Sequence, residues 1–292
     1  MINNPLSTTY DGSADQRLIE AALGGSGQAL EQLVRRHQHF IYNVALKMML
    51  NPADAEDLTQ EALIKMVTKL SQFQGRSNFR TWLYRITFNH FLNTKKNSME
   101  TAITSFEEYG HELDRVTDQT MTKEEEIAFK ELITEARLSC MSGMLLCLNR
   151  EQRLVYILGE IFNVDHKTGS EMLEITKANF RKRLERARRD LYQFMQNKCG
   201  LLNQANPCRC ARKTKGFIEA GWVDKDRMKY NTNFLNDILD VVEKKDDVLS
   251  DLLEDRYKTL FQKTPFQEKE HRERLMRSVL MDKEVRKLFR LN

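Results

Sequence analysis

The five cysteines are the residues of this chain whose types and spacing could do chemistry most directly. Cys199, Cys208 and Cys210 form a C-x8-C-x-C pattern with basic residues around it, and nearby positive charge lowers the pKa of a thiol. Zinc sites normally use four ligands, and no fourth ligand is obvious close by. Cys140 and Cys147 lie on an apolar stripe and are expected to be buried thiols. No cofactor is required by this pattern, so reduced packing thiols, a thiolate-bound zinc or other metal, and a redox sensor all remain open.

The patterns that mark common catalytic sites are missing from the sequence. It contains no glycine-rich phosphate loop, no H-E-x-x-H and no G-x-S-x-G. The six histidines are scattered, and none stands at a recognisable spacing from a nucleophile. We therefore predict no catalytic residue and expect that the protein is not an enzyme.

Composition favours a helical protein. The 292 residues include only 12 glycines and 4 prolines, and no run alternates between apolar and polar residues as a half-buried strand would. No apolar run approaches the roughly 20 residues that a membrane-spanning helix needs. The N-terminus also lacks the pattern of a secretory signal peptide. The sequence thus predicts an all-α, cytoplasmic protein without membrane insertion.

The elements that organise the chain lie between residues 51 and 93. Asn51 and Pro52 suit the cap and first turn of a helix, which then carries apolar residues at helical spacing and an acidic N-terminal half. A polar hinge follows at residues 74–78, where a glycine predicts a loop. The second helical run is basic and aromatic, with Trp82 expected to pack in the core.

This stretch, with AEDLTQEALIKM followed by QFQGRSNFRTWLYRITFNHFLN, resembles region 2 of the bacterial RNA polymerase sigma factors of the extracytoplasmic-function (ECF) group. The resemblance implies a helix that docks on the clamp helices of the polymerase's largest subunit, through Asp54, Asp57, Gln60 and Glu61. It also implies contacts to the minus-ten element of promoter DNA, through Phe73, Gly75, Arg76, Ser77, Asn78, Arg80, Arg85 and Asn89.

A second segment has a helix-turn-helix pattern. A short helix is expected over residues 167–173, a turn over 174–176, and a long basic helix over 177–196. Its apolar residues recur on one face, at Phe180, Leu184, Ala187 and Leu191. The segment resembles region 4 of the same sigma factors, which implies minus-thirty-five contacts by Lys177, Arg181, Lys182, Glu185, Arg186 and Arg189. Glu174 stands at a turn position that is often glycine in the family, and it is expected to lie away from the DNA-binding face.

These patterns divide the chain into six segments, two of which are helical domains joined by an acidic linker. The segments are a disordered N-terminus (1–13), region 2 (14–97), the acidic linker (98–122), region 4 (123–198), a cysteine-containing segment (199–215) and a helical C-terminal extension (216–292). The linker is expected to be flexible, because it has little periodicity and many like charges.

The resemblance implies a sigma factor for a stress- or signal-responsive regulon. Such a protein binds core RNA polymerase, at the clamp helices and the flap, and directs promoter recognition and transcription initiation. Its partners would be promoter DNA and an anti-sigma factor. The alternative is a helix-turn-helix regulator that binds DNA alone, but such a regulator has no need of an acidic docking helix beside an aromatic loop.

Overall fold

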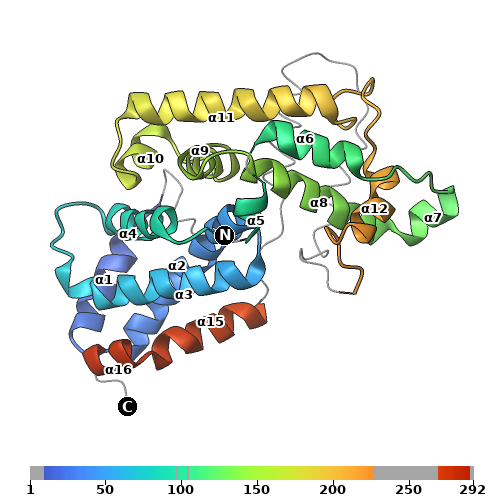
Figure 1. The fold of residues 1–292 in the computed structure, drawn as a ribbon. Helices are drawn as coiled ribbons and strands as arrows, with labels where there is room; N and C mark the ends of the chain where they lie inside the picture. Colours follow the sequence, from blue (N-terminus) through green and yellow to red (C-terminus); the bar gives the residue numbers. More distant parts are fainter. Residues whose placement is uncertain (1–9, 97, 104, 227–268, 290–292) are drawn as a thin grey trace. The chain divides into compact units, whose positions relative to one another are not determined.

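The computed structural model describes residues 10–226, except 97 and 104, and residues 269–289. These residues form helices and one isolated bridge, between Cys199 and Cys208, so the predicted all-α fold is confirmed (Figure 1). They divide into two compact units. Unit 1 takes in the described parts of Met1–Asn97, Ile157–Lys182 and Phe266–Asn292, and unit 2 those of Ser98–Tyr156 and Arg183–Pro265. The predicted division into functional segments is a different one and stays a prediction.

Unit 1 is built on four N-terminal helices. They are α1 (Ser13–Leu23), α2 (Gly27–Met49), α3 (Pro52–Thr68) and α4 (Phe79–Asn93), with the short η1 (Leu70–Gln72) before α4. Ser26 caps α2 by accepting a hydrogen bond from the Ala29 amide. Helix α2 is buried along most of its length because α1, α3 and α4 all pack on it. Four of its polar residues are buried as well, namely His37, Gln38, Asn43 and Lys47.

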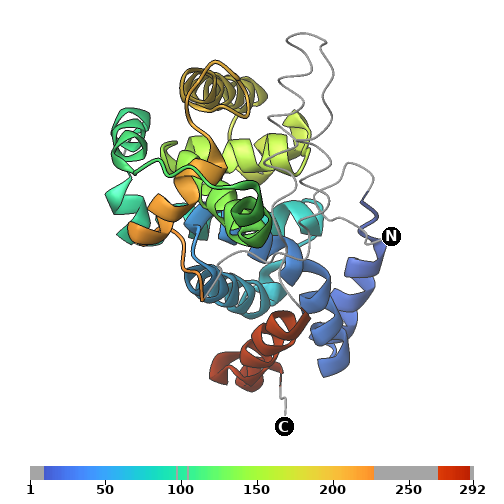
Figure 2. The same ribbon diagram turned by 90° about the vertical axis from the view of Figure 1, so that its right-hand side faces the viewer.

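The remaining helices of unit 1 come from later in the chain. They are the π-helical turn η2 (Ile157–Ile161), α10 (His166–Met172), the start of α11 (Lys177–Lys198), α15 (Lys269–Met281) and α16 (Lys283–Phe289). Helix α10 packs on α4. Helix α15 packs on α2 and α3, and α16 packs on α3. Both views of the ribbon show the red α15 beside the blue α3 (Figures 1 and 2).

Unit 2 is organised around α8 (Lys130–Leu146). The helices packed on it are α6 (Phe106–Arg115), α7 (Lys123–Ala128), α9 (Arg150–Tyr156) and α12 (Cys210–Glu219). At Gly143 of α8 a Cβ atom would lie 2.6 Å from the Tyr109 hydroxyl oxygen, so the close approach of α6 requires glycine there. The rings of Phe217 and Trp222 stack with centroids 5.0 Å apart beside this contact.

A buried ion-pair network fixes the short α5 (Ser98–Ala102) within unit 2. The carboxylate of Glu100 lies 2.5 Å from Arg150 and 3.0 Å from Arg153, and Arg153 also donates to the Leu145 carbonyl. Burial by itself would raise the pKa of Glu100, but the hydrogen bonds and charges of the two arginines hold it below its usual value. Removing one partner of such a buried network is expected to destabilise the unit strongly.

The segment at residues 98–122 is more ordered than its sequence suggests. Helices α5 and α6 form within it, and α6 begins with a Ser105 side chain that accepts from the Glu108 amide. Residues 116–119 are held by α12, because Lys213 donates to the Val116 carbonyl and the Gln119 amide donates to the Arg212 carbonyl. The expected lack of regular structure is thus wrong for α5 and α6, while the linker role stays a prediction.

The expected N-terminal disorder also needs a correction at its end. Residues 1–9 lie outside the described residues, but Tyr10 is buried and its hydroxyl donates to Asp15. Arg36 pairs with Asp15 at 2.7 Å, and it also donates to the Tyr10 oxygen. The buried carboxylate of Asp15, on α1, thus joins Tyr10 to Arg36 on α2.

Candidate polymerase and nucleic-acid interfaces

The predicted docking helix is α3, and its start is the one expected. The Asn51 side chain accepts from the Ala53 amide at 2.9 Å, and Pro52 occupies the first turn, where a missing N–H costs nothing. The apolar face of α3 is buried against α2 and α4. Of the four predicted docking residues, Asp57 and Glu61 are exposed, while Asp54 and Gln60 are half-buried. The helix therefore presents carboxylates on a rigid support.

One of these carboxylates has an intramolecular partner. Glu61 lies 3.0 Å from Nε2 of His90 on α4, and Nδ1 of the same ring lies 2.6 Å from the Lys65 ammonium. Burial and the charge of Lys65 lower the pKa of His90, whereas Glu61 acts in the opposite direction. Glu61 is thus held in position over the junction between α3 and α4.

Aromatic side chains gather at the loop between α3 and α4. The ring of Phe73 lies 5.3 Å from that of Phe79 and 5.4 Å from that of Trp82, and Phe79 stacks with Trp82 at 5.6 Å. Phe79 is buried, whereas Phe73 and Trp82 are partly exposed, so the core packing expected for Trp82 is only partial. Gly75 has a φ of 67°, which is a left-handed conformation that glycine adopts without strain. The exposed loop residues Gly75 and Arg76 therefore stand beside a partly open aromatic cluster.

Asn78, the last residue of this loop, has a structural role that its predicted DNA contact does not require. Its side-chain oxygen accepts from the Arg80 amide at 3.0 Å and so caps α4. Arg80 itself is buried, and its guanidinium carbon lies 5.6 Å from the centroid of the Tyr10 ring. In this conformation Arg80 stacks on the N-terminal segment of the protein, and its contact with DNA stays a prediction.

The other two predicted DNA residues of α4 meet the turn of the helix-turn-helix. Arg85 lies 3.3 Å from the carboxylate of Glu174, and the Asn89 amide lies 3.5 Å from the same carboxylate. Glu174 has a φ of 54°, the left-handed conformation that glycine favours. The expectation that Glu174 lies away from the DNA-binding face of the helix-turn-helix stays a prediction, but its pairing with two α4 residues that are predicted to contact DNA was not expected. The family's preference for glycine at this position hinted at the backbone conformation but not at the pairing.

The helix-turn-helix has the capping residues that its geometry needs. Asp165 accepts from the Lys167 and Thr168 amides to cap α10, and Thr176 accepts from the Asn179 amide to cap α11. Gly169 lies so close to the Phe180 ring that a Cβ atom would overlap it. The turn is thus set by side-chain caps and by one glycine at a helix contact.

The long helix α11 separates its apolar and basic residues as predicted. The stripe of Phe180, Leu184, Ala187 and Leu191 is buried. The predicted DNA-contacting residues are all exposed, namely Lys177, Arg181, Lys182, Glu185, Arg186 and Arg189. An exposed basic face opposite a buried stripe can lie in a DNA groove without disturbing the helix packing.

The cysteines differ from the expectation in two ways. Cys140 lines the same pocket of about 300 Å³ as Cys199, Cys208 and Cys210, so the missing fourth thiol comes from α8, far away in the sequence. Burial raises the pKa values of Cys140 and Cys199, and it raises that of Cys208 to about 12. The acidification expected of the C-x8-C-x-C thiols is therefore wrong for Cys199 and Cys208, because burial outweighs the nearby basic residues.

The four thiols of the pocket, as the structure positions them, do not form a metal-binding group. Among the described residues, no group of three or more His, Cys, Asp or Glu side chains is positioned so that it could hold a metal ion. Metal binding by the thiols thus stays a prediction that would require side-chain movement within the pocket. Periodicity could not reveal that Cys140 joins the others, because the packing of α12 on α8 brings them together.

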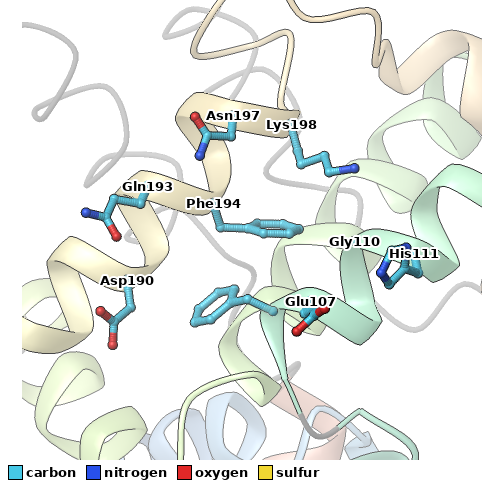
Figure 3. A pocket seen from close by; sticks show the side chains of 9 residues that line it. Glu107, Gly110, His111, Asp190, Gln193, Phe194, Asn197 and Lys198 are labelled. Atoms are coloured by element: carbon cyan, nitrogen blue, oxygen red, sulfur yellow. The ribbon is translucent and has the colours of Figure 1, made fainter.

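A second pocket of unit 2 has a different chemical character. It has a volume of about 420 Å³ and lies between α6 and the C-terminal half of α11, with Phe194 pointing into it (Figure 3). The Phe106 and Phe194 rings lie 5.3 Å apart, and Lys198 at the rim pairs with Asp114 at 2.6 Å. None of the predicted DNA-contacting residues lines this pocket.

Comparisons with known proteins show what this part of the chain is similar to. Residues 33–99 match the family model for sigma-70 region 2, which covers most of α2, all of α3 and α4, and the aromatic loop. Residues 33–99 are thus similar to sigma-70 region 2, and curated relatives named as ECF sigma factors confirm the predicted resemblance to that group. The C-terminal extension stays a prediction.

Two curated relatives illustrate the similarity. The RNA polymerase sigma-H factor of Pseudomonas aeruginosa is 39% identical over 85 residues, which are 29% of this chain and 42% of that protein. The ECF RNA polymerase sigma factor SigE of Mycolicibacterium smegmatis is 27% identical over 190 residues, which are 65% of this chain and 67% of that protein. This chain thus spans less than half the length of the sigma-H factor that it matches.

A solved structure is similar at a lower level. It is the structure of CnrH in complex with the cytosolic domain of CnrY, and the match covers 63% of this chain and 98% of the other, with 21% identity and a TM-score of 0.46.

Within the described residues of this chain, no helix combines the length and the apolar character needed to cross a membrane.

Proposed function

We propose that the protein is an ECF sigma factor that binds core RNA polymerase and directs promoter recognition and transcription initiation. The observation that carries this proposal is the sigma-70 region 2 match over residues 33–99, on helices that present an acidic face and an aromatic loop together. The protein would act in the cytoplasm and would catalyse no reaction itself, because the polymerase performs the chemistry.

The proposed polymerase contact is the exposed side of α3. Asp57 and Glu61 would meet basic groups on the clamp helices of the largest subunit, and Asp54 and Gln60 would lie at the edge of the contact. Complementary charge speeds association and excludes wrong partners, even where each ion pair adds little affinity. The flap of the polymerase would contact region 4, and an anti-sigma factor would compete for the same surfaces.

The proposed minus-ten contact is the aromatic loop. A base flipped out of the duplex can stack on an aromatic ring, at about 1–3 kcal/mol for each base. Phe73 is partly exposed beside Arg76 and Ser77, which supports this role. Arg85 and Asn89 would contact the upstream edge of the element once they are released from Glu174.

The proposed minus-thirty-five contact is the exposed face of α11. Arginine can bond guanine through two hydrogen bonds, and glutamate can accept one from cytosine. Arg181, Glu185 and Arg186 carry side chains of these types on the exposed face. A helix-turn-helix regulator acting alone would share this face, but it would not need the sigma-70 region 2 that precedes it.

Run-off transcription tests the proposal. Core RNA polymerase is incubated with genomic DNA fragments, with the protein, without it, or with a variant in which Asp57 and Glu61 are both lysine. We expect discrete transcripts only with the unaltered protein. Specific DNA binding without any change in transcription would favour the regulator that acts alone.

A further inference from the structure

The C-terminal helices α15 and α16 pack on α2 and on α3, the helix that the proposed function assigns to polymerase docking. Their apolar side chains Leu275, Met276, Val279, Val285 and Phe289 are buried. The contacts run from α15 to both α2 and α3, and from α16 to α3 (Figures 1 and 2). Apolar burial of this kind supplies most of the attraction between packed helices.

Two ion pairs position α15 on this surface. Arg274 lies 2.9 Å from both carboxylate oxygens of Glu56 on α3. Arg35 on α2 lies 2.7 Å and 3.1 Å from the carboxylate oxygens of Glu273. Exposed ion pairs add little stability, so their main effect here is to select the orientation of α15.

The charge of α15 and α16 matches the charge expected of a docking partner. Glu56 is adjacent in sequence to Asp57 and one helical turn before Gln60, so Arg274 stands at the edge of the predicted docking face. The exposed charges of these helices are mainly basic, at Arg274, Arg277, Lys283, Arg286 and Lys287, with the exposed Glu284 among them. A basic partner approaching Asp57 would meet Arg274, which already pairs with the neighbouring Glu56.

We infer that α15 and α16 are an internal competitor of core polymerase, seated on α2 and α3 at the edge of the docking face. The inference rests on the proposed function, because it needs that face to be the one the polymerase uses. A protein whose binding-competent state is only fractionally populated binds with an affinity reduced by that fraction. Release of the two helices should therefore strengthen polymerase binding.

The test compares two full-length variants that add the same charge to α15. Val279→Asp places a carboxylate at a position with 0% exposure, whereas Met281→Asp places one at a position with 67% exposure. Binding to core polymerase is measured by fluorescence anisotropy, and hydrogen exchange of α15 shows whether the helix has been released. We expect Val279→Asp to release α15 and to bind at least about tenfold more tightly, and Met281→Asp to change neither measurement.

Val279→Asp could also increase hydrogen exchange in α2 and α3, which would mean that the surface beneath α15 is disturbed. A third variant covers that outcome. Arg274→Glu repels Glu56 without placing a charge in the core, and it should also tighten binding. Fast exchange in α15 with unchanged or weaker polymerase binding would overturn the inference, as would an α15 that stays protected in both variants. If the unaltered protein and all variants failed to bind polymerase, the proposed function itself would be wrong.

Discussion

Arg85 and Glu174 form an ion pair of 3.3 Å between α4 and the turn that joins α10 to α11. Arg85 is predicted to contact DNA, and Glu174 occupies a left-handed backbone conformation that costs a residue with a side chain about 1–2 kcal/mol. The ion pair offsets only part of this cost, because pairs this exposed contribute about 0–1 kcal/mol. Glu174 thus pairs with Arg85, a residue that the proposed function assigns to promoter contact.

Substitution of Glu174 should separate the two effects. Glu174→Gly removes both the strain and the ion pair, whereas Glu174→Gln keeps the strain and removes the charge. We expect both variants to bind DNA more tightly at low salt, measured by anisotropy with a fluorescent duplex. The unfolding temperature of Glu174→Gly should equal or exceed that of the unaltered protein, and that of Glu174→Gln should lie below it. Equal DNA affinity in all three proteins would contradict a blocking role for Glu174.

Asn78 combines a cap with a predicted base contact, and its variants should distinguish these roles. Asn78→Ala removes the cap and should lower stability by about 1 kcal/mol. Asn78→Asp keeps a capping oxygen but places negative charge next to the DNA. We expect both to reduce promoter opening, measured by permanganate reactivity, while only the alanine variant lowers the unfolding temperature. Normal opening with Asn78→Asp would argue that the residue is only a cap.

The exposed face of α11 should contain two kinds of contact. Arg186→Ala is expected to relax base preference at one promoter position, because a good bidentate contact discriminates by about 1–3 kcal/mol. Arg189→Ala, next to Asp190 at 3.5 Å, is expected to weaken all sequences about equally and to reduce the salt dependence. Binding to a panel of single-base promoter variants measures both effects. If both variants weakened binding to every promoter sequence equally, α11 would contact only the DNA phosphates and would not read bases.

Lys47 predicts a pH dependence of stability. Burial lowers its pKa to about 7, from the 10.5 expected in an unfolded chain. Between these values the unfolded chain binds the proton and the folded protein does not, so this residue makes stability rise with pH. Lys47→Met should remove this pH dependence. Its free energy of unfolding should exceed that of the unaltered protein by more at pH 7 than at pH 9, and the two differences should themselves differ by on the order of 2 kcal/mol. Hydrogen exchange of α2 at the two pH values measures it, and an equal gain at both would exclude the lysine as the source.

The buried thiols should react slowly while the protein is folded. Because burial raises the pKa of Cys208 to about 12, little thiolate is present at pH 7.5. We expect alkylation by iodoacetamide to be at least about tenfold slower in the folded protein than in urea. Metal binding by the pocket would instead appear as stoichiometric zinc that is lost in Cys210→Ser and retained in Cys147→Ser, since Cys147 does not line the pocket.

Local signals predicted the local structure well. Asn51 and Pro52 begin α3, and the apolar stripe of α11 is buried as its spacing indicates. Helix α6 had a signal as well, because Ser105 stands three residues before Glu108 as in a capping box, but the acidic composition obscured it.

The features missed by the sequence interpretation depend on contacts between distant residues. The Arg85–Glu174 ion pair joins residues 89 positions apart, and Cys140 reaches the other thiols only because α12 packs on α8. Periodicity also does not indicate that α15 packs on α3. It predicts which face of a helix is apolar, but not the surface against which that face packs.

The position of α15 in the chain has a consequence for newly synthesised protein. A ribosome completes α3 at Thr68 and begins α15 at Lys269, so it must add about 200 residues in between, which takes roughly 10–40 s at bacterial rates. During that interval α2 and α3 can leave the ribosome and pack together while α15 does not yet exist. The surface of α2 and α3 is therefore uncovered in the nascent chain, and it can be covered only after α15 has been made.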